Sequence, residues 1–174
     1  MVRLLSQFAL ASMVLLAAHA LFQRPALTTP AAAQQPGPVY DELADANRDI
    51  AAALEKATSE QKLVLLVFGA NWCPDCRAFE AEANSADLGT ALALNYVTVK
   101  VDVARFKKNL DIARKYGLAL RRGIPAVVIL KADGEGVDVA DGRQITDLRK
   151  DGEKAVVKFF EDAVASAQKS ASVR

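Results

Sequence analysis

The pattern of apolar and polar positions along the chain predicts four strands. Residues 63–68 (LVLLVF) form a continuous apolar run, as a central strand buried on both faces requires. Residues 96–103 (YVTVKVDV) alternate between the two kinds of side chain, and residues 126–130 (AVVIL) are apolar over the length of a strand. The turn dipeptide Asp133-Gly134 then predicts a hairpin to a fourth strand around residues 137–140.

Apolar residues at helical spacing predict helices in the segments outside the strands. The first helix is expected over residues 41–58, where the spaced apolar residues include Leu43, Ile50 and Leu54. Asp151 is expected to cap a closing helix, whose apolar stripe would consist of Val156, Phe159, Ala163 and Ala167. Shorter helices are expected over residues 76–83, 87–94 and 108–116.

The order of these elements indicates the fold class. Helices and strands alternate through most of the chain, and two consecutive strands precede the last helix. This order predicts an α/β fold with a central mixed sheet of about four to five strands and helices on both faces. The first strands are expected to be parallel and the last pair to form a hairpin.

The N-terminal segment has a different composition. Residues 4–22 contain no acid, lysine or arginine, as in an export signal that is cleaved, or in a membrane anchor that is retained. Cleavage after Ala20 or Ala33 would place small residues at the cleavage site. We therefore expect a signal peptide or anchor with its tether over residues 1–33, a linker over 34–40 and one domain over 41–170, and an exported protein that is periplasmic or otherwise extracytoplasmic.

Charge and residue usage exclude several functions. Without residues 1–33, which carry Arg3 and Arg24 and no acid, the formal net charge changes from +1 to −1, so neither nucleic acid nor an acidic membrane is expected as a partner. The only histidine, His19, and both methionines lie in the same segment. Mechanisms that need an imidazole are therefore excluded in the exported domain.

The two cysteines carry the clearest chemical signal. Cys73 and Cys76 lie in the sequence WCPDC, directly after a buried strand and at the start of a helix. The free N–H groups of a helix N-terminus stabilise a thiolate, so Cys73 is expected to be the nucleophile and Cys76 to attack the mixed disulfide that Cys73 forms. A structural disulfide would close too short a loop to stabilise much, and two thiolates do not complete a zinc site. We expect redox chemistry with no metal and no cofactor other than the Cys73–Cys76 disulfide.

Four motifs in order extend this signal along the chain. They are FGANWCPDC (residues 68–76), KVDV (100–103), KYG (115–117) and RGIPAVVIL (122–130). With these motifs, residues 63–167 resemble the thioredoxin superfamily, in particular its small exported thioredoxin-like branch. The resemblance implies the thioredoxin fold and thiol–disulfide exchange with protein substrates.

The resemblance also assigns roles to residues around the cysteines. It implies that the Ile124–Pro125 peptide bond is cis and that the backbone of Ile124 binds an extended substrate peptide, although Pro125 could also simply start a strand. It implies that Trp72 packs beside the nucleophile and shields it, although Trp72 could be a core aromatic residue as well. Pro74 fits the first helical turn, where its missing N–H costs nothing.

The chain departs from thioredoxins proper in three places. In thioredoxins proper a buried acid six residues before the first cysteine accepts the proton of the second cysteine, and here Val67 occupies that position. Glu80, one turn after Cys76, could take that role, or it could lie on a solvated helix face. Residues 118–122 and 144–150 are extra, and their role is left open.

Asp75 suggests the direction of the exchange. Oxidases and isomerases of the superfamily usually have a histidine between the cysteines, whereas a carboxylate there disfavours the Cys73 thiolate and favours the disulfide. The direction indicates a protein-disulfide reductase, which we expect to receive electrons from a membrane thiol relay. We expect it to be a monomer and to contact the membrane only if residues 4–22 are retained. The alternatives are a disulfide oxidase or isomerase, and a non-catalytic adaptor or chaperone; copper delivery is disfavoured by the missing histidine and methionine ligands.

Overall fold

Four strands form one mixed sheet in the order β2-β1-β3-β4. The computed structural model describes residues 37–172, so the predicted signal peptide or anchor lies outside the described residues. β1 and β2 are parallel, and β3 is antiparallel to both β1 and β4. The strands are β1 (Leu63–Gly69), β2 (Tyr96–Asp102), β3 (Ala126–Leu130) and β4 (Gly136–Ala140). The predicted α/β class, with parallel first strands and a final hairpin, is confirmed.

The register brings one terminus of each of the four strands together at the same end of the sheet. Gly69 at the end of β1 lies opposite Asp102 at the end of β2. Phe68 lies opposite Ala126 at the start of β3, and Ala140 at the end of β4 pairs with Val127. The loops that follow β1, β2 and β4, and the loop that precedes β3, therefore meet at this end, and the cysteines lie in the first of them.

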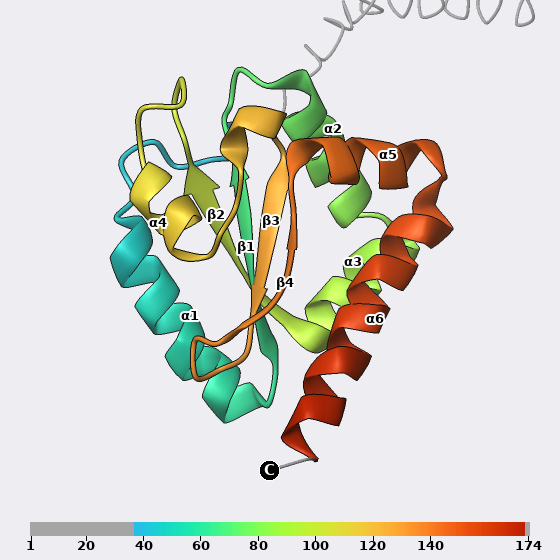
Figure 1. Cartoon of the computed structure of the whole chain (residues 1–174). Helices are drawn as coiled ribbons and strands as arrows, with labels where there is room; N and C mark the ends of the chain where they lie inside the picture. Colours follow the sequence, from blue (N-terminus) through green and yellow to red (C-terminus); the bar gives the residue numbers. More distant parts are fainter. Residues whose placement is uncertain (1–36, 173–174) are drawn as a thin grey trace, which may run out of the picture. The chain divides into compact units, whose positions relative to one another are not determined.

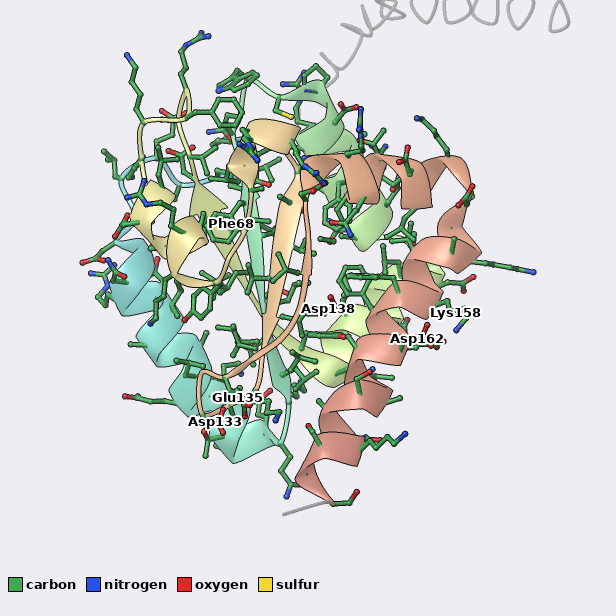
Figure 2. The ribbon with its side chains drawn as sticks, in the orientation of Figure 1. Phe68, Asp133, Glu135, Asp138, Lys158 and Asp162 are labelled. Atoms are coloured by element: carbon green, nitrogen blue, oxygen red, sulfur yellow. The ribbon has the colours of Figure 1, made fainter. Side chains whose placement is uncertain are left out.

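Helices cover both faces of the sheet (Figure 1). α1 (Ala46–Glu60) and α4 (Leu110–Lys115) pack on one face, and α3 (Ala86–Asn95), α5 (Gly142–Lys150) and α6 (Glu153–Ala171) pack on the other. α2 (Pro74–Ala83) follows β1 and contributes to both sides, because Cys76 belongs to the first core and Phe79 to the second. Figure 2 shows Phe68 inside the domain, and Lys158 and Asp162 on the outer side of α6.

The first helix starts later than predicted. The Asp45 carboxylate accepts hydrogen bonds from the backbone N–H groups of Asn47 and Arg48, at 3.1 and 3.2 Å, and so caps α1. Leu43 precedes this cap and its side chain is 94% exposed. The assignment of Leu43 to the buried stripe was wrong, because the capping residue, and not the apolar spacing, sets where the helix begins.

A helix that the sequence pattern did not predict precedes the closing helix. α5 begins with a capping box, in which the Asp141 side chain accepts from the N–H of Gln144 while the Gln144 side chain accepts from the N–H of Asp141. Asp151 ends α5, and α6 begins after Gly152, which has a φ of 99°. The prediction that Asp151 caps the closing helix was therefore wrong. Phe160 takes the fully buried place on α6 that was expected for Phe159.

The domain includes the end of the expected linker. The compact unit begins at Gly37, and Tyr40 is a fully buried member of the core on the α1 side. Within residues 37–172, no helix combines the length and apolar character needed to cross a bilayer.

Candidate redox site

Cys73 occupies the N-cap position of α2. Pro74 follows in the first turn, where a backbone N–H is not needed. The Cys73 Sγ accepts a hydrogen bond from the backbone N–H of Cys76 at 3.2 Å. The sulfur of Cys73 therefore lies where the N-terminal end of a helix stabilises negative charge.

The segment before β3 lies against the same sulfur. The Ile124–Pro125 peptide bond is cis, and the Cys73 thiol donates to the Ile124 carbonyl oxygen at 3.5 Å. Cys73 is 4% exposed. Cys73 and the backbone that the resemblance assigned to substrate binding are thus direct neighbours, although they are 51 residues apart in the chain.

Cys76 lies deeper than Cys73 and is fully buried. Burial raises the pKa of the Cys76 thiol well above its ordinary value, and the neighbouring Cys73 adds to this effect. The backbone of Ala70 and the Tyr40 hydroxyl, which lie near the Cys76 sulfur, lower the pKa of that thiol and so act in the opposite direction. The two thiols therefore differ in environment, as nucleophilic and resolving cysteines should.

Trp72 lies at the surface, over the loop after β2. Its indole N–H donates to the Ala104 carbonyl oxygen at 2.7 Å, and its ring meets Phe106 edge-on with the ring centroids 6.1 Å apart. The guanidinium of Arg105 lies 5.8 Å from the centroid of the indole ring. Because Trp72 is 43% exposed, it is a surface residue and not a core aromatic. It belongs to the redox edge, which is the end of the sheet formed by the Cys73–Cys76 loop, the loop after β2 and the cis-proline segment. That Trp72 shields Cys73 remains a prediction.

A family model described as thioredoxin-like matches residues 45–132, which include both cysteines and the cis-proline segment. The chain belongs to the thioredoxin-like family. The domain is 33% identical over 96 residues to thioredoxin H4 of Arabidopsis thaliana, with 55% of this chain and 73% of that protein covered. The crystal structure of a disulphide isomerase from Xylella fastidiosa is similar with a TM-score of 0.65 and 36% identity, covering 71% of this chain and 95% of that one. The predicted resemblance and fold are confirmed.

Asp75 of the thioredoxin-like domain has a cationic neighbour that the sequence did not reveal. The Asp75 carboxylate is 64% exposed and lies 3.8 Å from the Arg149 guanidinium, which reaches it from α5. Arg149 is held by two-pronged hydrogen bonds to Glu82 at 2.7 and 2.8 Å. The ion pair with Glu82 raises the pKa of Arg149, and the charges of Asp75 and Cys73 raise it further. Part of the negative charge between the cysteines is therefore compensated.

Glu80 forms an ion pair with Lys100 of β2. Burial lowers the pKa of Lys100 to about 8, and the nearby Cys76 opposes this change. Glu80 is thus joined, through Lys100, to the surroundings of Cys76, and its side chain is only 30% exposed. Proton transfer by Glu80 remains a prediction.

The two extra segments meet in the thioredoxin-like domain. Residues 118–122 include a short 3-10 helix, η1 (Leu120–Arg122), and the Arg122 guanidinium contacts the Asp141 carboxylate at 3.1 Å. Residues 144–150 belong to α5. The first segment leads into the cis-proline, and α5 carries Arg149 to α2, so both segments support the redox edge.

Sequence reasoning missed four residues of the site. They are Tyr40, Lys100 and Arg149, together with Asn71, whose side chain hydrogen-bonds the backbone of Tyr40. Asn71 and Lys100 lie inside quoted motifs, so position relative to the cysteines could have pointed to them. Tyr40 and Arg149 reach the site from distant segments and have no local signal.

Proposed function

We propose that this thioredoxin-like protein is a protein-disulfide reductase that works outside the cytoplasm. The observation that carries the redox function is the placement of Cys73: its sulfur caps α2, accepts the N–H of Cys76 and contacts the Ile124 carbonyl beside the cis-proline. A nucleophilic sulfur, a resolving sulfur and a peptide-binding backbone segment are the parts that exchange with a protein disulfide requires.

The reaction follows from the different surroundings of the two thiols. The Cys73 thiolate attacks one sulfur of a substrate disulfide, forms a mixed disulfide and releases the other substrate sulfur as a thiolate, which takes up a proton. Cys76 then loses its proton and attacks the Cys73 Sγ, which forms the Cys73–Cys76 disulfide and releases the second substrate thiol. The substrate gains two electrons and two protons, and the protein dithiol loses them.

Support for the reducing direction comes from Asp75, which places a carboxylate where a histidine would favour the reduced form. Export rests on the uncharged segment 4–22, and a membrane thiol relay would supply the electrons, because cytosolic reductases do not reach an oxidising compartment.

Disulfide isomerisation is the second candidate. Arg149 lies 3.8 Å from Asp75 and weakens the effect of its charge, and the similar Xylella fastidiosa structure is that of a disulphide isomerase. The reduction potential separates the two, since thioredoxin lies at about −270 mV and protein disulfide isomerase at about −180 mV.

The test combines turnover with trapping. The wild-type chain should reduce insulin with dithiothreitol faster than dithiothreitol alone, and both Cys73→Ser and Cys76→Ser should abolish this acceleration. Cys76→Ser should accumulate mixed disulfides with protein substrates, because the sulfur that releases them is missing. A wild-type protein without acceleration would favour the non-catalytic adaptor, and trapping by Cys73→Ser instead would reverse the two roles. A potential near that of protein disulfide isomerase, with reactivation of scrambled ribonuclease, would favour isomerisation.

A further inference from the structure

Tyr40 places a phenol hydroxyl against the resolving cysteine. Its side chain is 1% exposed, and its hydroxyl and the Cys76 thiol both lie against Gly69, close enough for each group to shift the pKa of the other. A Cβ atom at Gly69 would lie 2.1 Å from Tyr40 Oη and 2.9 Å from Cys76 Sγ. The absence of a side chain at Gly69 is therefore what leaves room for the hydroxyl and the sulfur to lie side by side.

The redox loop itself holds Tyr40 in place. The Tyr40 backbone N–H donates to Asn71 Oδ1, and Asn71 Nδ2 donates back to the Tyr40 carbonyl oxygen, both at 2.9 Å. The Asn71 amide therefore satisfies both backbone groups of Tyr40, much as a neighbouring strand would. Asn71 lies two residues before Cys73, so the segment that carries the nucleophile also fixes the phenol.

The resolving cysteine has no carboxylate where thioredoxins proper have one. Val67 fills that position and is 2% exposed. The titratable groups that face the Tyr40–Cys76 pair are Cys73 and, from β2, Lys100 and Asp102. The Tyr40 hydroxyl itself lies beside the Cys76 sulfur and lowers the pKa of the Cys76 thiol, as a hydrogen-bond donor to the thiolate would.

We propose that the Tyr40 hydroxyl donates a hydrogen bond to the Cys76 thiolate and thereby promotes the step that resolves the mixed disulfide. This rests on the proposed redox function. In that step the Cys76 thiolate attacks the Cys73 Sγ, the bond from Cys73 to the substrate sulfur breaks, and the substrate leaves as a thiolate that takes up a proton. When the protein disulfide is reduced again, Cys76 is the leaving group and the same hydrogen bond stabilises it. The phenol keeps its proton throughout.

The pKa shifts are consistent with the Tyr40 hydroxyl as a hydrogen-bond donor to Cys76 and not as a general base. Burial raises the pKa of the Tyr40 hydroxyl well above its ordinary value, and the two cysteines raise it further, so the hydroxyl stays protonated near neutral pH. A hydrogen bond to the charged form of a thiol lowers the pKa of that thiol, and this is the direction in which Tyr40 acts on Cys76. Removing the hydroxyl should therefore raise the pKa of Cys76.

The experiment follows the reactions of Cys73 and Cys76 as two successive kinetic phases. One equivalent of 5,5′-dithiobis(2-nitrobenzoate) is mixed with the reduced full chain, and the released thionitrobenzoate is followed by its absorbance across a range of pH. The first phase is attack by Cys73, and the second is attack by Cys76 on the Cys73 mixed disulfide, with loss of the second thionitrobenzoate. Tyr40→Phe should slow the second phase by about tenfold near neutral pH, since a hydrogen bond to a charged group is lost, and should move its pH midpoint upward. The first phase should not change.

Tyr96→Phe is the matched control. Tyr96 is also buried, and its hydroxyl donates to the Phe160 carbonyl oxygen on the other face of the sheet, so its loss costs a buried hydrogen bond without touching the cysteines. Both phases should stay as in the wild type. Asn71→Ala keeps the phenol but removes the two hydrogen bonds that hold the Tyr40 backbone, so it should also slow the second phase.

The outcomes are distinguishable. A second phase in Tyr40→Phe with the rate and pH midpoint of the wild type would overturn the role of Tyr40 while leaving the redox function intact. Equal slowing of both phases would show a structural role and would overturn it too. A wild-type protein that releases only one thionitrobenzoate per chain would instead overturn the proposed redox function.

Discussion

Replacing Asp75 by histidine tests how far the charge between the cysteines sets the direction of exchange. The substitution removes a carboxylate next to Cys73 and introduces an imidazole that is partly cationic near neutral pH. Both changes favour the Cys73 thiolate, so the reduced protein should become more stable relative to the disulfide. We expect a higher reduction potential and a poorer reductant.

The structure limits the size of this shift. Asp75 is 64% exposed, and Arg149 lies 3.8 Å from its carboxylate. Arg149 therefore compensates part of the Asp75 charge, and charge pairs that involve an exposed group usually contribute less than about 1 kcal/mol net. Because about 30 mV corresponds to 1.4 kcal/mol for a two-electron couple, the potential should rise by about 10 to 20 mV. Loss of Asp75 also frees the charge of Arg149 to act on Cys73, which changes the potential in the same direction.

Glutathione redox titration of the wild type and the variant measures the shift. Asp87→His is the control, because Asp87 is an exposed acid in the first turn of α3, where the same charge change occurs at a helix that carries no cysteine. It should leave the potential unchanged. An unchanged or more negative potential in Asp75→His would refute the electrostatic argument for a reductase, and oxidation or isomerisation would then be equally well supported.

Two further predictions address the thiols and the support of the cis-proline loop. In the reduced protein near neutral pH, alkylation mapped by mass should label Cys73 before Cys76, because Cys73 caps the helix and Cys76 is buried; the reverse order would contradict the assignment. Gly142→Ala should lower the free energy of unfolding by about 1 to 3 kcal/mol in urea, because its Cβ would lie 2.2 Å from the carbonyl carbon of Gly123 and 2.7 Å from the Ile124 nitrogen. Gly136→Ala, where a Cβ would meet nothing within 4 Å, should change stability far less, and equal losses would contradict the packing argument.

The strands and most helices could be predicted because their signals are local. β3 has the predicted bounds, and β1 differs from its prediction by only one residue at its end, since a continuous apolar run of strand length has few other uses in a domain of this size. The Cys73–Cys76 pair was equally accessible, because its motif contains both sulfurs and the start of the helix that positions them.

α5 could not be found from apolar periodicity. Its apolar face consists only of Ile145 and the partly buried Leu148, so the apolar stripe covers a single turn and is too short to stand out. The available signal was its capping box, Asp141 followed three residues later by Gln144. Asp151 was mistaken for an N-cap because an aspartate before an amphipathic run suits that role, while the helix that it ends was not visible in the pattern.

Tyr40 shows the limit of reasoning from motifs. It lies 36 residues before Cys76 and next to a segment without apolar periodicity, so nothing in its neighbourhood distinguishes it from a linker residue. Its contact with the cysteine depends on Asn71, 31 residues further along the chain, and on the space left at Gly69. Such long-range contacts are a property of the tertiary structure and not of any window of sequence.

The attachment of α5 at both of its ends has a consequence for local unfolding. Its first turn is tied through Asp141 to Arg122, just before the cis-proline segment, and its last turn is tied through Arg149 to Glu82 of α2. Transient detachment of this short helix would release the ion pairs to the residue before the cis-proline segment and to α2 in one event. A nine-residue helix that contains neither cysteine therefore couples local opening at these two places.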